Sequence, residues 1–164
     1  MTLPAIGDEI YPSDLDELNR VVWVNGTANV GDVTTVSTTE TALVTAPSYT
    51  YEASTVYKVE LGGLVRISAA SPNTPMFQLR KTNASGTLLC SNGRWPVVSI
   101  STNHGFNLIW HFQVGGSAVA AALCATLTGT AAYTATCAGS VQPTWINIYK
   151  IESAANITWP VTLV

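Results

Sequence analysis

The chain has 164 residues, of which 47% are hydrophobic and only 10% are charged, and its formal net charge is −3 at pH 7. Ordinary soluble domains carry about 25% charged residues, so much of this surface must be neutral or apolar. A chain of this length can form one domain whose core needs no disulfide bonds. No run approaches the ~18 to 20 apolar residues of a membrane-spanning helix, which argues against a membrane protein.

The first segment combines an extended arm with one short helix. Ser13 suits the N-cap position, and acidic residues follow it where the helix dipole favours anions, so we expect a helix over residues 14–19, with an extension to Val22 left open. Leu15, Leu18 and Val22 form a narrow apolar stripe that cannot fold alone and must dock elsewhere. The N-terminus has neither the basic start nor the apolar core of a secretion signal, so we expect folding in a cytoplasm.

From Trp23 onward the pattern changes to the period of two that is typical of strands. β-Branched residues, above all threonine, occupy much of this region and favour extended structure. A polar turn is expected over residues 26–32. The segments expected to be extended are 33–45, 55–61, 64–68, 77–81, 87–90, 95–101, 106–114, 119–127, 133–137 and 145–151.

Three local features refine this pattern. Gly62 and Gly63 predict a bulge or kink between two strands. Residues 83–86 predict the turn of a hairpin. The clearest alternation lies in residues 106–114, which we expect to form a central strand with Trp110 in the core.

Many short strands separated by turn signals, with no second helical pattern, predict an all-β protein. The expected fold is an antiparallel β-sandwich, jelly-roll-like, with a short N-terminal arm and helix. We expect the arm at residues 1–22, the sandwich domain at residues 23–152 and an extended strap at residues 153–164.

The carboxylates are unevenly distributed. Nine of the ten Asp and Glu residues lie at or before Glu60, and the tenth is Glu152. Hydrolytic, phosphoryl-transfer and metal sites usually recruit carboxylates, so their absence between these residues argues against most enzymes. A glycan depolymerase would need two of Glu40, Glu52, Glu60 and Glu152 as a close pair.

Nucleic acid is an unlikely partner on electrostatic grounds. Residues 1–20 carry five acids and one base, and an acidic arm repels phosphate backbones. The six bases of the remaining chain form no cluster in the sequence.

Histidine and cysteine offer no familiar catalytic or metal-binding pattern. His104 stands in a turn-like sequence and should face solvent, and His111 falls on the polar face of a strand. A catalytic triad or a zinc site would need further partners that the neighbouring sequence lacks. We expect Cys90, Cys124 and Cys137 to be reduced residues in or near the core, and we expect no cofactor.

The aromatic residues leave two interpretations open. Trp23 and Trp159 flank the β region and should anchor the arm and the strap to it or to a neighbouring subunit. Sugar rings stack on aromatic faces, so Trp95, Tyr49 and Tyr51 are candidate glycan contacts, whereas packing is the rival interpretation.

The opening residues 3–16, Leu-Pro-Ala-Ile-Gly-Asp-Glu-Ile-Tyr-Pro-Ser-Asp-Leu-Asp, resemble a start common among bacteriophage virion proteins, especially of actinobacterial phages. That start reads Pro-x-x-Gly-(Asp/Thr)-x-(Ile/Leu)-x-x-(Ser/Asp)-Asp-Leu-Asn, from which Asp16 departs. Residues 57–65, 77–86 and 161–164 resemble the small β-sandwich domains of phage head-decoration and tail-fibre proteins.

The resemblance implies a non-enzymatic virion component, made in the host cytoplasm and exposed on the virion surface. Its implied partners are copies of itself, as a homotrimer, and a major capsid protein or tail protein that holds the arm. A capsid decoration protein that stabilises the head ranks first, and a tail or fibre protein that recognises host glycans is the alternative. The apolar arm residues expected to attach to the particle are Ile6, Ile10, Tyr11, Leu15 and Leu18.

Overall fold

A computed structural model describes residues 21–36, 38–68, 75–94, 102–129, 134–151 and 162–163. Every regular element in these ranges is a strand, and none of the described residues forms a helix that could cross a membrane. The strands are β1 (Val21–Asn29), β2 (Asp32–Val36), β3 (Thr41–Tyr51), β4 (Val56–Ile67), β5 (Met76–Lys81), β6 (Leu88–Arg94), β7 (His104–Val114), β8 (Val119–Thr128), β9 (Thr134–Ala138), β10 (Thr144–Ile151) and β11 (Thr162–Leu163).

The strands pair in a nested order. β1 pairs with β10, β2 with β9, β3 with β8, β4 with β7 and β5 with β6, all antiparallel. Each pair encloses the next one in the sequence. The chain from β1 to β10 is therefore one long two-stranded ribbon, and its closed end is the turn between β5 and β6.

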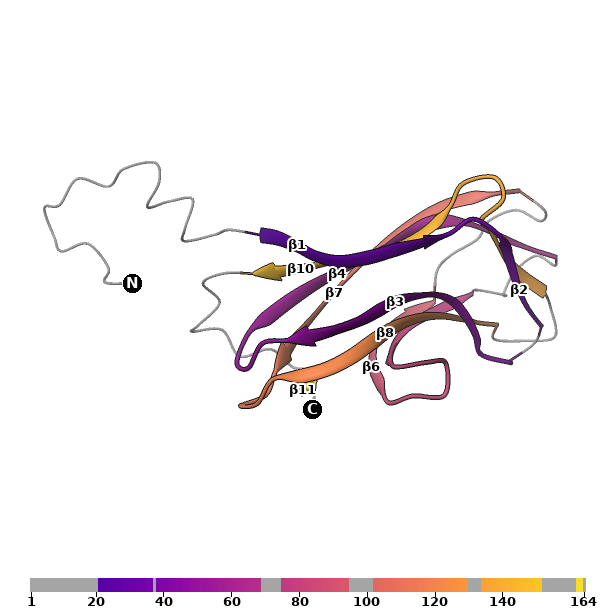
Figure 1. The fold of residues 1–164 in the computed structure, drawn as a ribbon. Coiled ribbons are helices and arrows are strands. Elements are labelled where there is room, and N and C mark those ends of the chain that lie inside the picture. Colours follow the sequence, from indigo (N-terminus) through magenta and orange to yellow (C-terminus); the bar gives the residue numbers. More distant parts are fainter. Residues whose placement is uncertain are drawn as a thin grey trace, which may run out of the picture.

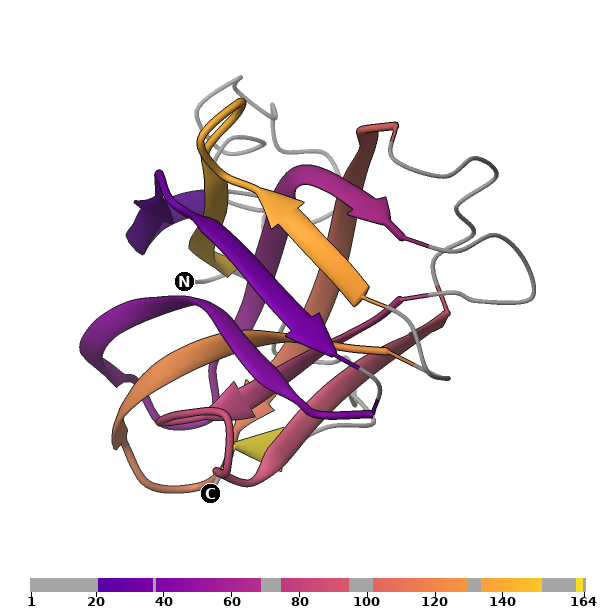
Figure 2. The ribbon, with the colours of Figure 1, turned by 90° about the vertical axis from the view of Figure 1, so that its right-hand side faces the viewer.

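The ribbon winds around itself and forms two layers. β4 also pairs with β10 and β9, and β5 also pairs with β8. The resulting sheets have the strand orders β1-β10-β4-β7-β11 and β3-β8-β5-β6. Figure 1 shows the two layers, and Figure 2 shows β2 and β9 crossing one end. Two sheets made from a wound ribbon are the arrangement of a jelly roll, so the predicted fold class is confirmed.

The inner faces of both sheets form the core. Side chains alternate along β7 as the sequence predicts, with Phe106, Leu108, Trp110, Phe112 and Val114 all 5% exposed or less. Burial of such apolar area stabilises the fold by roughly 25 cal/mol per Å². The prediction that Trp110 lies in the core is confirmed.

Aromatic rings join the layers at the end where β3 leads into β4. The Tyr51 ring meets the Tyr57 ring edge-on at a centroid distance of 5.0 Å, and Tyr57 stacks on Phe112 at 5.5 Å. Edge-to-face and offset contacts of this kind add to the stabilisation from buried area.

The bulge predicted at Gly62 and Gly63 is wrong, because β4 keeps its register with β7 through both residues, while its pairing with β10 ends at Gly62. The alternative of a kink stays a prediction. Gly62 instead makes room for a side chain on β10. A Cβ atom at Gly62 would lie 2.3 Å from Cζ2 of Trp145, so only glycine fits beneath that indole.

The predicted turn over residues 26–32 is also wrong in extent. β1 continues to Asn29 because Gly26 to Asn29 pair with Asn147 to Thr144 of β10. Asn25 and Asn29 also donate side-chain hydrogen bonds to β3, at the carbonyl oxygens of Pro47 (2.8 Å) and Leu43 (2.9 Å). The long threonine-rich segment after this turn divides into β2 and the start of β3.

The hairpin of β5 and β6 is confirmed, with its turn at residues 83–86. The central strand of the larger sheet is β4 rather than β7, because β4 pairs with three strands while β7 lies between β4 and the two-residue β11. The helix predicted over residues 14–19, the strand over residues 95–101 and most of the arm and strap lie outside the described residues. An extension of the helix to Val22 is wrong, because Val21 and Val22 already belong to β1. Leu163 of the strap is fully buried beside β7.

A matched pair of leucines in the β5–β6 hairpin tests this core. Leu79 is fully buried and Leu88 is 45% exposed. We expect Leu79→Ala to lower the free energy of unfolding by about 2 to 5 kcal/mol, because it leaves a cavity. Leu88→Ala should change it by about 0.5 kcal/mol or less. Urea unfolding of both variants measures the difference, and equal effects would contradict the assigned inner face.

Candidate functional site

The outer face of the larger sheet carries aromatic and polar side chains from four strands. Cross-strand pairing aligns Trp23, Tyr149, Lys58 and His111 in one row. A second row holds Gly26, Asn147, Glu60 and Ile109, and a third holds Ala28, Trp145, Gly62 and Asn107. We call these three rows the tryptophan face.

Two kinds of contact organise the tryptophan face. Nε1 of Trp23 donates a hydrogen bond to Oδ1 of Asn147 at 3.3 Å. Nζ of Lys58 lies 2.8 Å from Oε1 of Glu60 and 4.7 Å from the centroid of the Tyr149 ring. The single ammonium and the single carboxylate of the face thus neutralise each other, and the cation also covers the tyrosine ring.

The titratable groups of this face stay uncharged at neutral pH, apart from that ion pair. Burial, and then the charge of Glu60, raise the pKa of Tyr149. Burial, and then the charge of Lys58, lower the pKa of His111 below its ordinary value. The face is therefore neutral as a whole.

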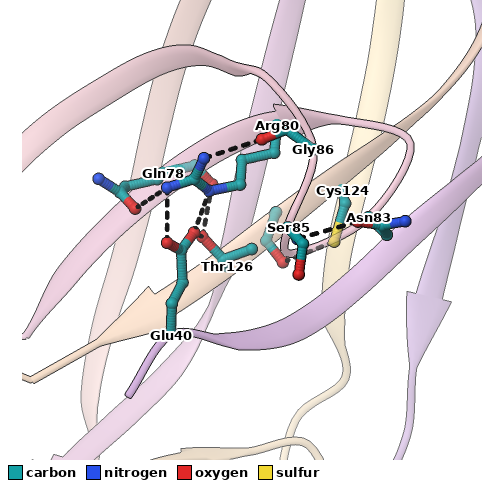
Figure 3. A network of polar contacts seen from close by, with 9 residues as sticks. Glu40, Gln78, Arg80, Asn83, Ser85, Gly86, Cys124 and Thr126 are labelled. Atoms are coloured by element: carbon teal, nitrogen blue, oxygen red, sulfur yellow. Dashed lines mark hydrogen bonds and ion pairs between the residues drawn. The ribbon is translucent and has the colours of Figure 1, made fainter. Parts of the chain in front are cut away.

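The outer face of the smaller sheet holds a different polar cluster, drawn in Figure 3. Arg80 binds both carboxylate oxygens of Glu40, at 2.5 and 2.6 Å, and donates to the carbonyl oxygen of Gly86 at 2.9 Å. Thr126 on β8 donates to the same carboxylate at 2.5 Å. The cluster fastens the turn of the β5–β6 hairpin to the start of β3 and to β8. Its groups bind one another, which fits a structural role.

The pKa of Glu40 is lowered although the carboxyl group is partly buried. Burial by itself acts to raise this pKa, but the hydrogen bonds from Arg80 and Thr126 outweigh that effect.

The predicted glycan contacts receive little support from their positions. Tyr51 is fully buried, so it presents no side-chain surface to a glycan and is withdrawn as a candidate. Tyr49 is partly buried, and its ring centroid lies 5.0 Å from that of Tyr51. Trp95 and the predicted attachment residues, Ile6, Ile10, Tyr11, Leu15 and Leu18, lie outside the described residues.

The predicted solvent-facing turn at His104 is wrong. His104 begins β7, is partly buried and pairs with Val65. The reason is the unbroken β4, whose pairing with β7 extends past the two glycines. His111 lies on the outer face, as predicted.

The cysteines occupy the predicted environment. All three are free, with Cys124 and Cys137 buried and Cys90 partly buried. Burial raises the pKa of Cys90 to about 11 and that of Cys137 to about 12, so these two thiols are poor nucleophiles at neutral pH.

The described carboxylates of the proposed depolymerase pair have separate ionic partners. Glu40 binds Arg80, Glu52 binds Lys150 at 2.7 Å, and Glu60 binds Lys58. Glu40 and Glu60 lie on the outer faces of opposite sheets. Among the residues that the structure describes, no three His, Cys, Asp or Glu side chains form a group able to hold a metal ion.

The tryptophan face was not predicted from the sequence. Trp23 is 57% exposed among the described residues. Its predicted contact with the arm or with a neighbouring subunit stays a prediction, because the arm lies outside those residues. Trp23 stands between Val22 and Val24, whose side chains point to the other side, and this alternation was the available signal. The alignment of Trp23 with β10 follows only from strand pairing.

Comparisons with known proteins leave the family undetermined. No family model matches the chain, and no curated protein matches it. Solved structures of infectious bursal disease virus show a remote structural similarity to this chain. The structure of the Gt strain is 10% identical in sequence, with a TM-score of 0.45 over 81% of this chain. The structure of the derived T=1 particles is 12% identical, with a TM-score of 0.42 over 80% of this chain. The structure of the VP2 subviral particle is 10% identical, with a TM-score of 0.39 over 81% of this chain.

This chain spans between 36% and 38% of the length of those virus chains. Since the TM-scores lie below 0.5, the likeness carries no argument about function.

The carboxylate of Glu40 provides a test by pH. Its lowered pKa means that its contribution to stability is complete above its ordinary value of 4.5 and is lost as the pH falls through the folded-state value. We expect Glu40→Gln to lower the free energy of unfolding at pH 7 by about 1 to 2 kcal/mol. The difference from the unaltered protein should shrink between about pH 5 and pH 3.

Glu52→Gln is the matched control, because Glu52 is 54% exposed in its ion pair with Lys150. Unfolding of the three proteins by urea across this pH range measures the effect. A constant difference between Glu40→Gln and the unaltered protein at every pH would contradict the assignment.

Proposed function

We propose that this protein is a non-enzymatic virion component, and specifically a capsid decoration protein that binds the outside of a phage head and stabilises it. The proposal is supported first by the sequence resemblance of the opening segment and of residues 57–65 and 77–86 to phage virion proteins. The arm would attach to the head, and the sandwich would face outward and contact other copies.

The fold is compatible with this role. Jelly rolls occur in viral capsid domains and also in lectins and cupins, so the fold narrows the function without deciding it. The absence of Asp and Glu from residues 61–151 favours the structural role over hydrolytic or metal-dependent chemistry.

The observation that carries the proposal is the neutral, partly apolar exterior of a well-packed sandwich. Large apolar side chains are exposed on several strands and at the end where β1 leads into β2. Val30 and Val141 are 70% and 63% exposed. Val30 precedes Gly31, and Val141 lies two residues after Gly139, whose backbone is in contact with that of Gly31. Exposed apolar surface of this kind is characteristic of proteins that contact other proteins.

Binding to purified particles tests the proposal. We expect the full-length protein to sediment with DNA-free heads of the parent phage in hundreds of copies per head, and not with isolated tails. The double variant Ile10→Asp/Leu15→Asp should reduce head binding by about tenfold or more, because it places charge in the apolar contacts of the arm.

The matched control is Ser85→Asp/Thr87→Asp, which adds the same charge at exposed positions of the sandwich. It should bind heads as the unaltered protein does. Binding to tails and never to heads would refute the decoration role, and unchanged binding of the arm variant would refute attachment through the arm.

The oligomeric state is a separate prediction. We expect sedimentation equilibrium to give three times the 17.3 kDa mass of the chain. The neutral exterior favours association between copies, since interfaces that bury about 1,200 to 2,000 Å² are stable with few charges at their centre. A monomer at concentrations of about 100 μM would contradict the trimer.

A further inference from the structure

We propose that the tryptophan face is a binding site for an uncharged saccharide. The proposal goes beyond the decoration role, because it concerns the outward surface of the sandwich and not its attachment to a particle. The site centres on two indole rings, Trp23 and Trp145, with Asn147 between them.

The indole ring of Trp145 packs against the outer face of the larger sheet, over Gly62. Its indole occupies the space that a side chain on Gly62 would take, with Cε2 and Cζ2 at 2.6 and 2.3 Å from the position of a Cβ atom there. Gly62 is buried although it belongs to the outer face, because this ring covers it. A ring held against the sheet in this way turns its other side outward.

Trp23 is held down in a similar manner. Its Nε1 lies 3.2 Å from the position of a Cβ atom on Gly26 and donates to Asn147. The hydrogen bond fixes the ring, and yet 57% of the residue remains exposed. A fixed and exposed indole costs little conformational entropy when a ligand stacks on it.

A sugar ring is the ligand that suits such indoles. Pyranose rings present a face of C–H groups that packs on an aromatic ring, and hydroxyl groups at their edges that need hydrogen-bond partners. Successive outward residues on β10 are about 7 Å apart, so Trp145, Asn147 and Tyr149 span about 14 Å. That distance matches two to three sugar units.

The polar groups between the rings complete the match. Within the described part of the chain, Asn147 accepts a hydrogen bond through Oδ1, and its Nδ2 donates to no described group. Asn107 adds an exposed carboxamide, and the Glu60 carboxylate can accept from hydroxyl groups. The neutral charge of the face favours an uncharged saccharide over a sialylated or sulfated one.

The same polar groups argue against a second copy of the chain as the occupant. A flat protein surface packed on this face would bury the Lys58–Glu60 pair and the carboxamides of Asn107 and Asn147. Burial of such groups without new partners is unfavourable. Saccharide hydroxyls, in contrast, supply donors and acceptors at the spacing of the face.

A glycan array tests the proposal. The probes are neutral hexose and pentose oligosaccharides, with sialylated and sulfated chains as the charged arm, and the full-length protein is applied. We expect binding to neutral members and a dissociation constant, measured by calorimetry on the strongest one, that rises about tenfold or more in Trp23→Ala. Asn147→Ala should weaken binding in the same direction.

Leu88→Ala is the control, because Leu88 is a similarly exposed apolar residue on the other sheet. It should bind as the unaltered protein does. Circular dichroism verifies that Trp23→Ala stays folded, and sedimentation should give it an unchanged mass. No binding to neutral members, equal binding by Trp23→Ala, or loss of oligomers in Trp23→Ala would each overturn the proposal. Head binding by Trp23→Ala should persist, which separates this test from that of the decoration role.

Discussion

The nested pairing of β1 to β10 is the constraint on which the rest of the structure depends. Every pair other than the β5–β6 hairpin encloses all the pairs that lie between its two strands in the sequence. The outermost pair unites residues as distant as Trp23 and Asn147, 124 positions apart. Strands such as β4 and β7 alternate between buried and more exposed residues, so a shift of one residue in their pairing would turn apolar side chains to solvent. The register is therefore set by the core as a whole.

The outer faces of the two sheets carry different kinds of side chain, and we propose a different role for each. On the smaller sheet, Glu40, Arg80 and Thr126 bind one another and fasten the closed end of the ribbon. On the larger sheet, the indoles of Trp23 and Trp145 lie over glycines and present aromatic surface outward. One face thus holds the ribbon closed, and the other is suited to a ligand.

The proposed attachment arm and outward-facing sandwich would also account for the uneven charge of the chain. Five of the ten carboxylates fall within residues 1–20, and the described ones of the sandwich are paired with Arg or Lys or bound to neighbouring groups. Asp32, for example, accepts from the backbone and the side chain of Ser140 and pairs with Arg66. The acids of the sandwich thus serve its structure and leave its exterior neutral, which suits contacts with other copies and with uncharged ligands.

The sequence by itself determined the all-β class, the inward side of β7 and the β5–β6 hairpin, because alternation and turn residues are local signals. It could not reveal that β4 runs unbroken through Gly62, that His104 lies in a strand or that Tyr51 is buried. Each of these depends on a partner strand far away in the sequence. The tryptophan face likewise depends on distant strands. Nothing in the sequence links Gly62 to Trp145, and the two residues come together only when β4 pairs with β10. The alternation of residues along a strand predicts which way a side chain points, whereas its neighbours on the sheet are decided by the pairing of strands in the tertiary structure.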